Sequence, residues 1–136
     1  MRTSLRLLGL DPGLRRTGWG IIDVTDNHCR HVANGTVTSR NDDPLAERLK
    51  QIHEGLLEVI ALHAPQAAAI EETFVNQNPA STLKLGQVRG VVMLAASRSG
   101  LDVAEYAPNA IKKAVVVRPA SLPEVSRPAT RRLISA

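Results

Sequence analysis

The segment Leu5-Arg6-Leu7-Leu8-Gly9-Leu10-Asp11-Pro12-Gly13 begins the pattern on which the rest of the fold is built. Its apolar run predicts a buried strand over residues 5–10, and Asp11-Pro12-Gly13 is a turn signal that ends the strand. Two more strand-like runs follow after short connections, at Trp19–Val24 and Val32–Thr38. Short connections favour antiparallel pairing, so we expect a three-stranded meander.

Beyond this meander the pattern changes to helices that alternate with strands. Apolar residues recur every three or four positions between an expected N-cap at Asp43 and a helix stop at Pro65. The next elements are expected as a strand at 67–70, a helix from 78 to about 99, a strand at 103–106 and a helix opening at Pro108-Asn109. This alternation favours parallel strands joined by right-handed crossovers. The chain is therefore expected to form an α/β fold, a mixed sheet with helices packed on its faces.

The composition limits the class of protein and its organisation. The chain has 136 residues, 43 % of them hydrophobic, which suits one globular domain. A single cysteine, Cys29, excludes a disulfide scaffold and a cysteine-based zinc ribbon. We find neither a signal peptide nor an apolar run of the roughly 18–20 residues needed to cross a bilayer, so we expect a cytoplasmic protein without a membrane partner.

The last part of the chain differs from the rest. Residues 118–136 are rich in proline and arginine and have no helical or strand period. We expect one domain over residues 1–117 and a disordered tail over 118–136. Most of the formal net charge of +4 lies in that tail, so the charge is poor support for a nucleic-acid partner.

Two carboxylates follow the two most apolar strands. Asp11 comes directly after the first strand, and Glu71 ends the strand that starts at Ala67. If these strands are neighbours, both carboxylates meet at the carboxyl edge of the sheet. Oxygen ligands of this kind suit Mg²⁺ or Mn²⁺. Taken alone, however, Asp11 is more often a turn former and Glu71 a solvated strand end.

Collinear motifs around these residues make the pair informative. The run Gly9-Leu10-Asp11-Pro12-Gly13, continued to Gly20, resembles the first motif of the RuvC family of crossover-junction endodeoxyribonucleases, which are Holliday junction resolvases. Ile70–Asn76 is similar to the family's second motif, and Leu83–Gly90 to the helix motif that follows. Glu105–Asn109 and the pair Lys112-Lys113 continue the likeness, which covers about residues 5–116 in the family's order and spacing.

The resemblance implies an RNase H-like fold and two-metal hydrolysis of phosphodiester bonds with Mg²⁺, for which Mn²⁺ is a plausible substitute. It implies a symmetric homodimer that nicks two opposed strands of a four-way DNA junction in recombination and repair, with RuvA and RuvB as partners. Asp11 matches the family's first catalytic aspartate and Glu71 its catalytic glutamate, so both are expected metal ligands. The chain is accordingly expected to be an endonuclease and a hydrolase.

The resemblance also suggests DNA-contacting residues. Phe74 matches an aromatic that the family presents near the junction centre, although core packing would explain it equally well. The cations Lys84, Arg89, Lys112 and Lys113 are candidate phosphate contacts, with a solvated helix face as the equal alternative for each.

The sequence departs from the family pattern after Val116. The family's remaining two catalytic aspartates come from a C-terminal helix rich in Asp and Ala, and here only Glu124 is acidic in that region. We therefore expect a C-terminally truncated or frameshifted family member, without the last helix and with little or no nuclease activity.

Two other functions remain open at this stage. The chain is alternatively a non-catalytic remnant that binds junctions or dimerises. A third possibility is another RNase H-like protein, such as an actin-like ATPase or a sugar kinase, although the motifs at 71–76 and 84–90 argue against it.

Overall fold

The computed structural model describes residues 4–72 and 78–106, which form a five-stranded sheet and two helices. The strands are β1 (Ser4–Asp11), β2 (Arg16–Thr25), β3 (His28–Thr38), β4 (Ala67–Glu71) and β5 (Asp102–Tyr106), and the helices are α1 (Leu45–His63) and α2 (Pro79–Arg98). The expected helix from Pro108 and the proposed tail 118–136 lie outside the described residues.

The sheet is mixed, as the sequence predicts. Its strand order is β3-β2-β1-β4-β5. β1 pairs antiparallel with β2, which pairs antiparallel with β3, whereas β4 runs parallel to both β1 and β5. The chain passes from β3 to β4 through α1 and from β4 to β5 through α2, so it crosses over the sheet twice after the meander.

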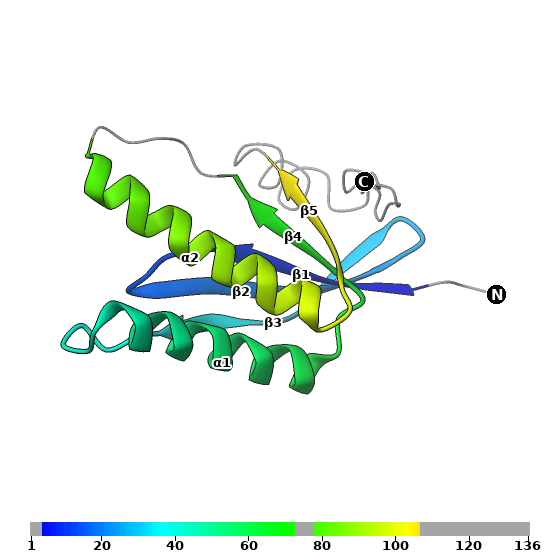
Figure 1. The fold of residues 1–136 in the computed structure, drawn as a ribbon. Coiled ribbons are helices and arrows are strands. Elements are labelled where there is room, and N and C mark those ends of the chain that lie inside the picture. Colours follow the sequence, from blue (N-terminus) through cyan, green and yellow to red (C-terminus); the bar gives the residue numbers. More distant parts are fainter. Residues whose placement is uncertain (1–3, 73–77, 107–136) are drawn as a thin grey trace.

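Both described helices lie on the same side of the sheet (Figure 1), against the face that carries Leu8 and Leu10 of β1. α1 buries an apolar stripe of Ile52, Leu56 and Ile60 at four-residue spacing. α2 buries Val88, Val92, Ala95 and Ala96. Together these side chains make one core with β1, β2 and β4.

The ends of the two helices only partly match the predictions. α2 begins as expected, because the side chain of Asn78 accepts hydrogen bonds from the backbone N–H groups of Ala80 and Ser81 at 3.0 and 3.2 Å. The expected N-cap at Asp43 is wrong, because Pro44 occupies the cap position without a side-chain bond. The Asp43 carboxylate instead accepts bonds from Gln51 at 2.6 Å and from Arg40 at 3.0 Å.

The opposite side of the sheet, hereafter the open face, carries a smaller apolar cluster. Leu7, Ala67 and Ala69 form its buried part. Leu5, Ile22 and Tyr106 pack against them. Among residues 4–72 and 78–106, no helix packs on this face.

Arg6 interrupts the apolar run of β1 because it holds three elements together. Its guanidinium donates to both carboxylate oxygens of Asp23 on β2, at 2.7 and 2.9 Å, and to the backbone carbonyl of His63 at 2.9 Å. The hydrogen bond from Arg6, with a second partner in Arg30, holds the pKa of the Asp23 carboxyl below its usual range. Through these bonds Arg6 holds the C-terminal end of α1 against β1 and β2.

One glycine marks the closest approach of a helix to the sheet. A Cβ built on Gly55 of α1 would lie 2.3 Å from Cγ1 of Val37 on β3. Glycine at this position therefore lets α1 pack directly on β3. Neither α1 nor α2 is long and apolar enough to span a membrane.

Candidate functional site

Asp11 and Glu71 are the last residues of two neighbouring parallel strands. Leu10 of β1 and Ile70 of β4 are register partners, so the next residue on each strand reaches the same edge of the sheet. Side chains alternate along a strand, and Leu7 and Ala69 face the open side. Both carboxylates therefore lie on the open face, on strands about 4.8 Å apart. The structure brings together the two residues that the sequence analysis paired.

A shallow cavity of about 300 Å³ adjoins the two carboxylates. It is lined by Gly9, Leu10, Asp11, Gly18, Trp19, Gly20 and Glu71. A Cβ built on Gly9, Gly18 or Gly20 would meet no atom closer than 3.7 Å. Packing does not require these glycines, and they leave the floor of the cavity as bare main chain.

The turn after Asp11 has a fixed shape. The hydroxyl of Thr17, which is fully buried, donates to the carbonyl of Gly13 at 2.9 Å and accepts from its N–H at 3.2 Å. A Cβ on Gly13 would lie 2.3 Å from the carbonyl oxygen of Arg16, so only glycine fits there. These contacts fix the backbone that follows Asp11. They therefore also fix the position of Asp11 at the end of β1.

Tyr106 is the register partner of Glu71 on the outer strand. Burial raises the pKa of its phenol above the ordinary value. Its ring packs on Leu7, Ala67 and Ala69, which closes the apolar side of the site.

The carboxylate pair fits one hard divalent cation. Within the described ranges, no group of three or more His, Cys, Asp or Glu residues is placed to hold a metal. Two carboxylates at the lip of an open cavity are nevertheless a usual donor set for Mg²⁺, which keeps waters and takes further oxygens from a substrate phosphate.

The structure describes only some of the predicted DNA contacts. Phe74, Lys112 and Lys113 lie outside the described residues. Lys84 is exposed on α2 and forms no ion pair with a described residue. The side chain of Arg89 is only 17 % exposed and pairs with Glu105 on β5. A phosphate contact by Arg89 stays a prediction, and it would require that this ion pair break.

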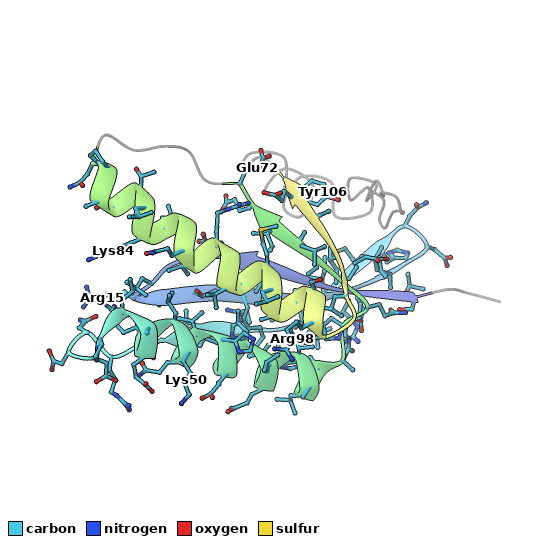
Figure 2. All side chains as sticks on the ribbon, viewed as in Figure 1. Arg15, Lys50, Glu72, Lys84, Arg98 and Tyr106 are labelled. Atoms are coloured by element: carbon cyan, nitrogen blue, oxygen red, sulfur yellow. The ribbon has the colours of Figure 1, made fainter. Side chains whose placement is uncertain are left out.

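Arg15 and Arg16 are two further cations near the site that were not among the predicted site residues. Both are exposed directly after the turn that follows Asp11, and neither pairs with an acidic residue of the described chain. Figure 2 shows Arg15 at the end of the molecule where β1 leads into β2. Their position inside the first motif could have indicated a role at the site. A pair of charged residues after a turn is, however, common in any soluble protein.

The fold and the site together define a class. A mixed sheet with three antiparallel strands, two added parallel strands and carboxylates at the ends of β1 and β4 is the RNase H-like arrangement of metal-dependent nucleases.

Comparison with known proteins narrows this class to one family. The family model described as crossover junction endodeoxyribonuclease RuvC matches residues 7–122. The crossover junction endodeoxyribonuclease RuvC of Rhizobium etli is 59 % identical over 116 residues, which are 85 % of this chain and 69 % of that protein. The chain belongs to the RuvC family of crossover junction endodeoxyribonucleases, a family of metal-dependent nucleases. An ATPase or a sugar kinase is thereby excluded as its family.

Solved structures agree with this assignment. Thermus thermophilus RuvC in complex with a Holliday junction substrate matches with a TM-score of 0.72 and 29 % identity, over 82 % of this chain and 70 % of that one. The yeast mitochondrial Holliday junction resolvase Ydc2 matches with a TM-score of 0.59 and 12 % identity, over 83 % and 58 % of the two chains. At that identity the second likeness supports the fold alone.

Proposed function

We propose that this chain binds four-way junction DNA at the edge of the sheet that carries Asp11 and Glu71. The two carboxylates would hold a divalent cation there, Mg²⁺ by preference, with Mn²⁺ as a substitute. The observation that carries the proposal is the parallel register of β1 and β4, which brings both carboxylates to one face beside an open cavity. The family membership supports the choice of substrate.

The chain's own residues have distinct parts in this function. Asp11 and Glu71 supply the oxygen ligands, and carboxylates suit this task because they bind hard cations strongly. The glycine floor leaves room for a phosphodiester to approach them. Thr17 and Gly13 fix the backbone beside Asp11. When bound, the cation supplies charge stabilisation for phosphodiester hydrolysis.

We propose further that nicking by residues 1–136 alone is weak or absent. Two-metal hydrolysis needs a symmetric clamp of ligands around the reacting phosphate. Asp11 and Glu71 are two of the four carboxylates that the family resemblance implies, and residues 117–136 contain only Glu124 as an acidic residue. One weakly held cation favours binding of the substrate over its cleavage.

A labelled synthetic four-way junction tests both proposals. We expect the chain to bind the junction more tightly than a duplex of the same length, and to release little nicked product in Mg²⁺. The variants are Asp11→Asn at the site and, as a matched control, Asp102→Asn at the start of β5. Equal affinity for junction and duplex would contradict the binding proposal. Sustained turnover that Asp11→Asn abolishes and Asp102→Asn preserves would contradict the proposed impairment.

We also propose a homodimer that forms through α2. Its outer side exposes Leu83 (64 %) and Leu94 (51 %), and a Cβ on Gly86 or Gly90 between them would meet nothing within 4 Å. A cavity of about 460 Å³ continues this side toward β5, lined by Gly90, Met93, Leu94, Ser97, Val103 and Glu105. A second copy is the fitting occupant, because one chain carries one Asp11–Glu71 pair and two opposed junction strands require two.

Sedimentation analysis tests the dimer. We expect Leu94→Glu to shift the chain toward the monomer, because a charge would be buried without a partner in the interface. Leu62→Glu is the matched control, since Leu62 is 78 % exposed on α1, outside the proposed interface. The dimer proposal fails if both variants sediment as the unmodified chain does.

Other features remain proposals from the family resemblance. These are the cytoplasmic location, the partners RuvA and RuvB, and the DNA contacts of Phe74, Lys84, Arg89, Lys112 and Lys113.

A further inference from the structure

The open face of the sheet has two chemically different halves. Toward the start of β1 it is the apolar cluster around Leu7, Ala67 and Ala69. Toward the end of β1 it carries glycines, and beyond them the exposed side chains of Arg16 on β2 and of Thr36 and Thr38 on β3. We call this second region, made of Arg16, Thr36, Thr38 and the glycine floor (Gly9, Gly18 and Gly20), the polar half.

The strand register places the polar half beside Asp11. Gly18 is the partner of Asp11 on one side and of Thr36 on the other. Arg16, two residues before Gly18, is the partner of Thr38. Directly opposite residues share a face of the sheet, as do residues two apart along one strand. The open face therefore carries Arg16, Thr36 and Thr38 as well as Asp11. Neighbouring strands of a sheet lie about 5 Å apart, and residues two apart along one strand lie about 7 Å apart.

The charge of Arg16 is available to a ligand. Four other described arginines form ion pairs within the chain: Arg6 and Arg30 share Asp23, Arg40 pairs with Asp43 and Arg89 with Glu105. Arg16 is exposed and pairs with no acidic group among residues 4–72 and 78–106.

The backbone that carries Arg16 is held in place. Ser39, which is buried, donates from its N–H to the carbonyl of Arg15 at 3.2 Å and from its hydroxyl to the carbonyl of Leu14 at 2.6 Å. Because the backbone next to Arg16 is already fixed, only the side chain has to be ordered when its guanidinium binds a ligand. This lowers the entropy cost of binding.

We propose that the polar half binds the sugar-phosphate backbone of the DNA strand that enters the Asp11–Glu71 site. Arg16 contacts a phosphate of that strand, and Thr36 and Thr38 donate hydroxyl hydrogen bonds to it. The glycine floor lets the strand lie close to the sheet. This inference rests on the proposed function and adds the residues that hold the strand.

A DNA strand suits this surface better than a protein does. The region offers a cation and hydroxyls, and phosphate oxygens are bound by groups of this kind. A stable protein interface would need a centre of large apolar side chains, and the polar half is made of glycines, threonines and an arginine.

The test measures binding of a labelled four-way junction at several salt concentrations, without a divalent cation, so that cleavage plays no part. We expect Arg16→Gln to weaken binding about tenfold, since a charged hydrogen bond is lost. The slope of log affinity against log salt should fall by about 1. Arg16→Lys should restore the slope. Thr38→Glu, an exposed strand position, should weaken binding further by repulsion.

Arg98→Gln is the matched control, because Arg98 is exposed, has no ion pair with a described residue and lies toward the other end of α2 from Lys84 (Figure 2). Unchanged affinity and salt slope in both Arg16→Gln and Thr38→Glu would overturn the inference while leaving the proposed function intact. An equal loss in Arg98→Gln would overturn it too, since the effect would then be general charge. If the unmodified chain binds no junction, both the inference and the proposed function fail.

Discussion

An Asp11→Asn chain is expected to lose nearly all of its affinity for Mn²⁺, by about 100-fold or more. Changing a residue that only hydrogen-bonds to a metal ligand typically lowers metal affinity by about 10–100-fold. Asp11 is one of the two carboxylates proposed to bind the metal directly, so its loss should lower the affinity at least as much. The amide keeps the size of the side chain but removes its charge. Glu71→Gln should have the same effect from the neighbouring strand, because both carboxylates face the same cavity.

Titration calorimetry or the electron paramagnetic resonance signal of free Mn²⁺ measures this affinity directly, and neither depends on nuclease activity. Asp102→Asn serves as the control because Asp102 opens β5 at the opposite edge of the sheet. The double variant Asp11→Asn with Glu71→Gln should lose little beyond either single change, as expected for two ligands of one cation. Unchanged Mn²⁺ binding in Asp11→Asn would show that the cation is held elsewhere.

Two glycine-to-alanine changes in the two helices are expected to act in opposite directions on stability. Alanine normally stabilises a helix interior by roughly 0.5–1 kcal/mol relative to glycine. Gly86→Ala should show this gain when it is compared in the Leu94→Glu background, which disfavours the proposed dimer, since a Cβ there meets no atom of the same chain within 4 Å. Gly55→Ala should instead destabilise by about 1–3 kcal/mol, because its Cβ would lie 2.3 Å from Val37, a β-branched side chain that cannot turn away freely.

Urea denaturation at matched protein concentration measures both changes in the free energy of unfolding. The midpoint should rise for Gly86→Ala and fall for Gly55→Ala, with an unchanged slope in both. A second change, Val37→Ala, should recover part of the loss in the Gly55→Ala background by making room for the added methyl group. A rise in midpoint for both single variants would mean that α1 does not pack on β3 as closely as described.

The mixed sheet and the carboxylate pair were accessible from the sequence for a specific reason. Leu5–Leu10, apart from Arg6, and Ala67–Ile70 are apolar runs, which suit strands in the middle of a sheet. Each ends in an acidic residue, and neighbouring parallel strands align such ends. The likeness to family motifs then set the two residues apart from ordinary turn formers.

Other features depended on contacts that no local pattern encodes. Asp43 has the right residue type for an N-cap, but it is drawn to Gln51 and Arg40 by the way the loop returns over α1. From the sequence, Arg89 is expected to be an exposed cation on a helix. In the structure it forms an ion pair with Glu105 across the boundary between α2 and β5. Arg16 needs the register of β2 with both of its neighbours before its relation to Asp11 becomes visible.

The glycine floor has a consequence for the choice of cleavage sequence. Its N–H and C=O groups belong to the β1–β2 and β2–β3 ladders, so they are already committed to the sheet. A strand resting on Gly9, Gly18 and Gly20 meets a shape and no hydrogen-bonding code. This part of the protein is therefore indifferent to which bases pass over it, and any preference among nucleotides has to be imposed by side chains that reach the bases from outside the floor.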